Sequence, residues 1–191
     1  YSCKIAFGMA VSQPPALLKA VADRARAGKF ERVDMYYMHA EEPANNTILD
    51  YDLMPIIKPH PGFIGKKERE LVLMGERVGK KLVDYLPNSF SQMPAYMCSL
   101  DLDAFIVTVS PMDKYGFFSM GTNNDYGFAA LRHCKRLIIE VNQNMPRVFG
   151  RSQIHIDQVA YIVENTIPLI EMKPRPPKPA DKIIGEKIAK R

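Results

Sequence analysis

The sequence lacks long apolar runs, a secretory leader and any cysteine pair. None of its 191 residues lies in an uninterrupted apolar stretch of the roughly 18 residues that a membrane-spanning helix requires, so we expect no membrane contact. No basic segment followed by an apolar one opens the chain, so no secretory signal is visible. The three cysteines, Cys3, Cys98 and Cys134, form no Cys-x-x-Cys pair and have no histidine at ligand spacing. They fit reduced thiols in a cytoplasmic protein better than disulfides or a zinc site, and we expect no bound metal.

Over most of the chain, neither positive nor negative charge is in excess. The net charge is +5, but residues 173–191 hold seven basic and two acidic side chains, so residues 1–172 sum to zero. A surface that binds phosphate backbones should appear as a basic patch on the folded body. We therefore expect no nucleic-acid partner. With 47% hydrophobic residues, the chain fits one globular domain, or one domain and a tail.

Apolar patterning predicts strands that alternate with helices. Helices are expected at 14–28, 65–79, 91–98 and 126–133, and strands at 5–10, 33–38, 82–86, 104–109 and 136–141, with short extended pieces at 153–156 and 160–163. This alternation is typical of an α/β fold with a mostly parallel sheet and helices on both faces. Residues 41–62 are rich in proline and are expected to form a long, irregular connection.

The texture of the chain changes after residue 172. We expect a domain over 1–172, a proline-rich linker over 173–180, and the start of a truncated second domain over 181–191. Asp181 is expected to cap the last helix, whose isoleucines have nothing of their own to pack against. Since the first residue is Tyr1 and a strand pattern begins at once, we also expect N-terminal residues to be missing.

The most distinctive segment is Ser110–Gly121, directly after the predicted buried strand at 104–109. In open α/β sheets, ligands bind beyond the carboxyl ends of the strands. Ser119 and Gly121 offer a hydroxyl and a backbone that a ligand can approach closely. The segment is therefore either a ligand-binding loop or a hairpin-like loop with structural glycines.

The pattern Ser-Pro-x-Asp-x-x-Gly-x-x-Ser-x-Gly in this segment resembles the acetyl-CoA hydrolase/transferase family, N-terminal domain, of the 4-hydroxybutyrate CoA-transferase type. Further similar segments follow the family's order along the chain: Gly8–Leu18, Glu140–Pro146, Ser152–Val163 and Asp181–Ile188. The resemblance implies a class I CoA-transferase-like α/β domain. Together these segments are specific, although none is so alone.

The resemblance also implies a reaction and its participants. A glutamate in a second, C-terminal domain attacks an acyl-CoA thioester, and a glutamyl-CoA thioester then passes CoA to a short-chain carboxylate such as 4-hydroxybutyrate or acetate. The CoA thioester is a substrate, no cofactor is bound permanently, and a homodimer is expected. This chain alone is then expected to be inactive. We expect Glu140 and Glu164 to be solvated or paired carboxylates rather than nucleophiles.

This chain should then supply one wall of a cleft for substrate and CoA. The candidates are polar or small residues at predicted strand ends, joined by a histidine in the long connection: Ser12, Gln13, Ser119, Gly121, Asn123, Asn142, Gln143 and His60. Hydrogen bonding within turns and caps is the competing role for each. Two other functions stay open: an acyl-CoA hydrolase of the same fold, and a non-catalytic α/β interaction module with a proline-rich tail.

Overall fold

A six-stranded parallel sheet organises the chain. The computed structural model describes residues 1–171 and 174–190. The sheet has the order β3-β2-β1-β4-β6-β8 and every neighbouring pair is parallel. Its strands are β1 (Ser2–Phe7), β2 (Arg32–Tyr37), β3 (Ile57–Pro61), β4 (Ala104–Val109), β6 (Leu137–Val141) and β8 (Tyr161–Glu164). The predicted parallel α/β fold is confirmed.

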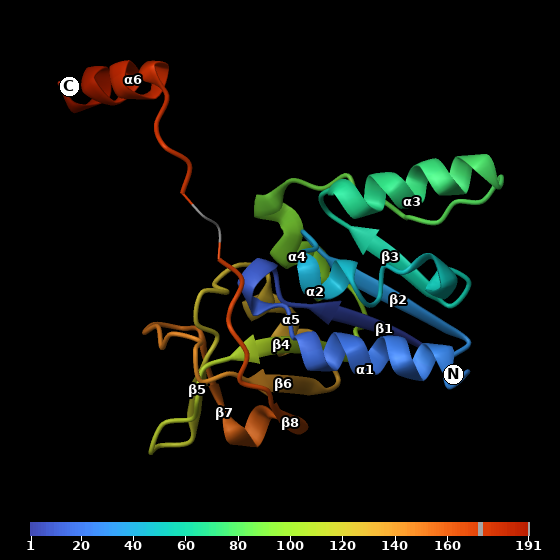
Figure 1. The fold of residues 1–191 in the computed structure, drawn as a ribbon. Helices are drawn as coiled ribbons and strands as arrows, with labels where there is room; N and C mark the ends of the chain where they lie inside the picture. Colours follow the sequence, from blue (N-terminus) through green and yellow to red (C-terminus); the bar gives the residue numbers. More distant parts are fainter. Residues whose placement is uncertain (172–173, 191) are drawn as a thin grey trace.

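Helices cover both faces of this sheet. They are α1 (Pro15–Arg26), α2 (Glu42–Asn45), α3 (Lys66–Arg77), α4 (Met93–Ser99) and α5 (Gly127–His133), whereas a further helix, α6 (Pro179–Ala189), does not contact the sheet. One core cluster joins α1, α2 and α3 to β1, β2 and β3, and a second joins α4 and α5 to β4 and β6. Figure 1 shows α1 in front of the sheet. Among the described residues, no helix is long and apolar enough to cross a membrane.

The central strand β4 shows why this sequence folds in this way. All six residues of its Ala-Phe-Ile-Val-Thr-Val sequence are buried. A strand in the middle of a parallel sheet is covered on both faces, so it has to be apolar along its whole length rather than at alternate positions. The strand predicted at 104–109 is confirmed, and its carboxyl end is near the centre of the sheet's edge.

Residues 41–62 are more regular than the sequence indicates. They contain α2, a 3-10 turn at Tyr51–Leu53 and the edge strand β3. His60 therefore lies in a strand and not in a loop, so that expectation is wrong. Pro59 and Pro61 fit in β3 because an edge strand has one side on which a backbone N–H is not needed.

The same prolines explain why the strand predicted at 82–86 is not formed. Asp84 N donates to Pro59 O and Leu86 N donates to Pro61 O, both at 2.9 Å, so this segment does lie beside β3. Neither proline has an N–H to donate in return. The pairing is one-sided, and the ladder that would make a seventh strand is absent.

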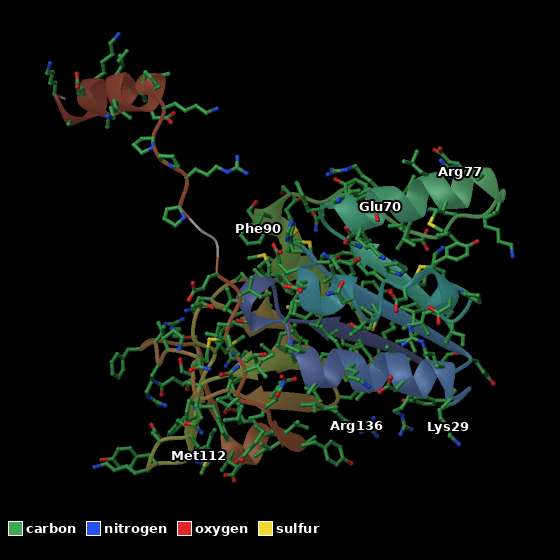
Figure 2. The ribbon with its side chains drawn as sticks, in the orientation of Figure 1. Lys29, Glu70, Arg77, Phe90, Met112 and Arg136 are labelled. Carbon is green, nitrogen blue, oxygen red and sulfur yellow. The ribbon has the colours of Figure 1, made fainter. Side chains whose placement is uncertain are left out.

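A smaller antiparallel sheet lies beyond the carboxyl edge of the main one. It pairs β5 (Phe117–Ser119) with β7 (Gln153–His155). Figure 2 shows Met112, from the loop before β5, at this edge, whereas Lys29 and Arg136 lie at the opposite edge. The two short extended pieces predicted near the C-terminus correspond to β7 and β8.

The last helix is separate from the rest of the structure. Figure 1 shows α6 away from the sheet, and Ile183, Ile184 and Ile188 are each more than half exposed. The predicted boundary at 172 and 173 lies outside the described residues. The helix begins at Pro179, and Asp181 in its first turn accepts a hydrogen bond from Lys178 N. Lys178 is thus the N-cap residue, and the prediction of Asp181 at that position is wrong.

Candidate functional site

The turn that follows β1 is tight and strained. Gly8 is required there, because a Cβ at this position would lie 2.4 Å from the backbone oxygen of Ser12. Ala10 has a φ of 48°, which among the described residues makes it the one non-glycine with positive φ. Such left-handed residues are strained and cluster at functional sites. The turn directs the chain from β1 into the Pro14-Pro15 start of α1.

Gln13 ties three strand ends together. Its Nε2 donates to His39 O at 2.8 Å, and its Oε1 accepts from Glu41 N at 3.2 Å. Its backbone oxygen accepts from Thr108 Oγ1 of β4 at 3.0 Å. Gln13 is only 2% exposed. Both ends of its amide are therefore engaged by the protein, and they fix the connection after β2 to the end of β1.

Glu140 lies beneath the first turn of α1. Its Oε2 accepts from Leu17 N at 3.1 Å and its Oε1 accepts from Asn165 Nδ2 at 2.6 Å. The carboxyl group is fully buried, and burial raises its pKa. Glu140 is thus hydrogen-bonded inside the protein rather than solvated.

Asn142 and Gln143, which follow β6, bind the segment that follows β8. Asn142 Nδ2 donates to Ile167 O at 2.9 Å, and its Oδ1 accepts from Asn144 N at 2.8 Å. Gln143 N donates to Thr166 Oγ1 at 3.4 Å. These bonds place the segment after β8 across the carboxyl edge of the sheet.

A cavity of about 420 Å³ lies at this edge. It is lined by Val11, Gln13, Pro15, Lys19, Glu42, Pro43, Asn46, Thr47, Thr108, Asn142 and Ile167–Ile170. These residues come from the ends of β1, β4 and β6, from α1 and α2, and from the segment that Asn142 holds. A second cavity, of about 440 Å³, lies between the Tyr51 turn and Leu82 at the amino ends of the strands. Position therefore favours the first as the functional site.

The Ser110–Gly121 segment is built largely by its own hydrogen bonds. Ser119 Oγ donates to Val148 O at 3.0 Å and accepts from Gly121 N at 3.1 Å. Gly121 has a φ of 60°, and a Cβ there would lie 2.3 Å from Met145 Sδ. Asp113 Oδ1 accepts from Phe117 N at 2.9 Å. These side chains support the loop, and none lines the 420 Å³ cavity.

The other three candidates lie apart from the cavity. Ser12 is fully buried, and among the described residues its Oγ has no hydrogen-bond partner. Asn123 is buried with its amide nitrogen 2.7 Å from Asp125 Oδ2, in the orientation that satisfies both ends of the amide. His60 Nε2 lies 2.7 Å from Asp34 Oδ1. The structure thus brings together Gln13 and Asn142 at the cavity, with Gln143 adjacent.

Sequence reasoning missed five polar or charged residues of the cavity. They are Lys19, Glu42, Asn46, Thr47 and Thr108. Thr108 had a usable signal, since it is the single polar residue of an otherwise apolar strand and lies next to its carboxyl end. The other four lie in helices or in a connection whose path the sequence does not reveal.

None of the three thiols lines the 420 Å³ cavity, and in the described part of the chain one of them contacts a histidine. Cys134 Sγ donates to Leu131 O at 3.5 Å, whereas His133 Nδ1 lies 3.4 Å from Cys98 Sγ. Burial raises the pKa of Cys3 to about 11 and also raises that of Cys134. Within the described residues, no three histidine, cysteine or acidic side chains are placed to hold a metal ion.

The fold and the cavity define the class. This is an open, parallel α/β domain with a ligand-sized cavity at the carboxyl ends of its strands. The family follows from comparison: residues 2–171 match the acetyl-CoA hydrolase/transferase N-terminal domain, and the chain belongs to that family. The resemblance drawn from the sequence motifs is confirmed.

Individual relatives support this assignment. The chain is 31% identical over 188 residues to 4-hydroxybutyrate coenzyme A transferase of Clostridium kluyveri, covering 97% of this chain and 42% of that protein. It is 30% identical over 186 residues to succinyl-CoA:cyclohexane-1-carboxylate CoA transferase of Geobacter metallireducens, covering 97% and 40%. The crystal structure of RipA from Yersinia pestis superposes with a TM-score of 0.93 at 43% identity, covering 98% and 44%. The chain therefore spans less than half the length of these relatives.

Proposed function

We propose that the protein containing this domain is an acyl-CoA:carboxylate CoA-transferase. It would move CoA from an acyl-CoA to a short-chain carboxylate, releasing the original acyl group as its carboxylate. The observation that carries the proposal is the family match over residues 2–171, joined to relatives that are themselves named CoA transferases. The proposal includes a C-terminal domain, a homodimer and a cytoplasmic location.

The proposed reaction is a ping-pong exchange in which bonds and charges balance. A glutamate carboxylate of the C-terminal domain attacks the thioester carbonyl, the C–S bond breaks, and CoA leaves as a thiolate. The thiolate attacks the glutamyl carbonyl of the resulting anhydride, which releases the first carboxylate and leaves a glutamyl-CoA thioester. The incoming carboxylate then repeats both steps in reverse order. No oxidant, net proton or permanently bound cofactor is required.

In this scheme the present domain binds and orients rather than attacks. Glu140 is already engaged by Leu17 N and Asn165 Nδ2 inside the protein, so it is not available as a nucleophile. The cavity at the strand ends would form one wall of the site. A carboxylate nucleophile is weak, so most of the acceleration has to come from positioning and from stabilising the oxyanion.

The test separates transfer from hydrolysis. The full-length protein is mixed with acetyl-CoA and butyrate, butyryl-CoA is followed by chromatography, and free thiol is followed by a colorimetric reagent. A transferase produces butyryl-CoA without net thiol release, whereas a hydrolase releases thiol and produces no butyryl-CoA. Absence of both would leave the non-catalytic interaction module. The 191-residue chain alone is expected to be inactive in both assays.

A further inference from the structure

The cavity at the strand ends has a mostly apolar wall. Val11, Pro15, Pro43 and Ile167–Ile170 supply the apolar lining. Its volume of about 420 Å³ falls within the range of small-molecule pockets, roughly 300–1,000 Å³. An apolar surface of this size favours a ligand with an apolar body.

The buried polar side chains of the cavity are already satisfied. Gln13, Thr108 and Asn142 are each at most 2% exposed. The Gln13 amide bonds His39 O and Glu41 N, and the Asn142 amide bonds Ile167 O and Asn144 N. The hydroxyl proton of Thr108 is given to Gln13 O. A hydroxyl carried deep into this cavity would therefore find few free partners.

The charged residues of the cavity lie at its solvent-exposed opening, the mouth. Lys19 and Glu42 both line the cavity and are both exposed, and Lys19 is the one cation among the lining residues. Lys19 Nζ also pairs with Asp23 at 2.5 Å. A carboxylate at the mouth can stay solvated near Lys19 while its hydrocarbon part enters the cavity. This orientation leaves the reacting group facing outward.

We propose that this cavity is the subsite for the acyl group of the carboxylate acceptor, and that it selects acids with an apolar body over acetate and over ω-hydroxy acids of equal size. The proposal rests on the proposed transferase function and narrows its substrate class. The segment Ile167–Ile170 sets the length limit because all four of its residues line the cavity. Leu169 is the half-buried residue of that wall whose size is most easily changed.

The first test compares acids on the full-length protein. Pentanoate and 4-hydroxybutyrate have nearly the same shape and differ by a methyl in place of a hydroxyl. We expect kcat/KM to be about tenfold to a hundredfold higher for pentanoate, the range over which apolar pockets discriminate such pairs. Equal values, or a preference for 4-hydroxybutyrate, would overturn the proposal. If no acid accepts CoA, the proposed function itself fails.

The second test changes the wall. Leu169→Trp should lower kcat/KM for pentanoate about tenfold or more and leave that for acetate within about threefold, since acetate needs little of the cavity. Leu169→Ala should extend the preference to longer acids. Val11→Phe fills the cavity from another lining position and serves if Leu169→Trp does not fold. Phe149→Ala, an exposed residue outside the cavity, is the control. A parallel loss for acetate and pentanoate would show a merely structural wall and would refute the subsite.

Discussion

The Glu140 carboxylate caps α1 from a strand that lies 123 residues further along the chain. Its Oε2 accepts from Leu17 N at 3.1 Å. The first N–H groups of any helix lack partners within the helix, and α1 begins with Pro14 and Pro15, which offer no side-chain acceptor. A carboxylate near the helix N-terminus is also favoured by the helix dipole. Through Asn165, the same group anchors the start of the segment that walls the cavity.

Replacing Glu140 should separate hydrogen bonding from charge. Glu140→Ala leaves Leu17 N and the Asn165 amide, both of half-buried residues, without this acceptor, and we expect it to lower the free energy of unfolding by about 2–4 kcal/mol. Glu140→Gln keeps an oxygen for Leu17 N, and Asn165 can turn its own oxygen toward the new amide nitrogen. Its change should stay within about 1 kcal/mol. Urea unfolding of both variants measures the difference, and equal destabilisation would contradict this role.

The stability of the parent and that of Glu140→Gln should depend differently on pH. Burial raises the pKa of Glu140 above its ordinary 4.5. Below 4.5 the carboxyl group is protonated in both states. As pH rises from 4.5 through the raised value, the unfolded state loses its proton first, so the folded protein loses stability over that interval. Glutamine does not titrate. The Tm of Glu140→Gln minus the Tm of the parent should therefore become more positive as the pH rises from 4 to 8. If this difference became more negative, the assignment would be refuted.

The sequence predicted the order of elements well because the parallel sheet leaves a strong signal. Strands such as β4 are buried along their whole length, and α1 ends at Arg26, two residues before Gly28, whose φ of 66° suits the position that follows a helix C-cap. The failures lie at the sheet edge. Pro59 and Pro61 indicate a loop when read alone. They form a strand because β3 pairs with β2 along one side only, and the missing proline N–H groups lie on the other side. That pairing is tertiary information.

The sequence predicted the edge of the sheet at which the candidate cavity lies, but not which strand-end side chains point into it. Gln13 and Asn142, both expected at strand ends, line the candidate cavity. Whether a strand-end side chain points into a cavity or into a turn depends on the path of the following loop, so Ser119 and Gly121 were indistinguishable from cavity residues in the sequence. The contribution of Ile167–Ile170 depends on how Asn142 holds the chain, which no local pattern encodes.

The strained turn after β1 gives a prediction at Ala10. Its φ of 48° costs an L-residue about 1–2 kcal/mol, and glycine avoids this. Glycine also raises the conformational entropy of the unfolded chain, which lowers stability by about 0.4–1 kcal/mol. Ala10→Gly should therefore be neutral to stabilising by about 1 kcal/mol. Ala10→Val should be destabilising, because a branched Cβ is poorly accommodated at positive φ. Urea midpoints for the two variants test the order, which would be reversed if Ala10 were unstrained.

Gly121 and Gly28 form a matched pair for separating strain from overlap. Both have a similar positive φ, 60° and 66°, but a Cβ at Gly121 would lie 2.3 Å from Met145 Sδ, whereas a Cβ at Gly28 meets nothing within 4 Å. Gly28→Ala should therefore cost about 1 kcal/mol from backbone strain alone. Gly121→Ala should cost about 2–4 kcal/mol because overlap is added. Thermal and urea unfolding measure both, and equal losses would mean that Met145 yields freely.

The loop before β5 should open when its internal carboxylate loses charge. Asp113 Oδ1 accepts from Tyr115 N and Phe117 N, both at 2.9 Å, and its Oδ2 pairs with Arg147. The hydrogen bond from Phe117 N contributes most to lowering the pKa of Asp113 below its ordinary 3.8. A depressed pKa means that the stabilisation is present above 3.8 and is lost as pH falls through the folded value.

Hydrogen exchange at the Tyr115 and Phe117 amides reads this loop directly. Protection relative to the intrinsic rate should be constant above pH 4 and fall below it. Asp113→Asn keeps an acceptor oxygen but no charge, so its protection should be lower than that of the parent and independent of pH in this range. Arg147→Met should make Lys114, at the exposed tip of the loop, more readily cleaved by trypsin at neutral pH. If Arg147→Met and the parent were cleaved at the same rate, the ion pair would not be what closes the loop, and the two backbone bonds to Asp113 would suffice.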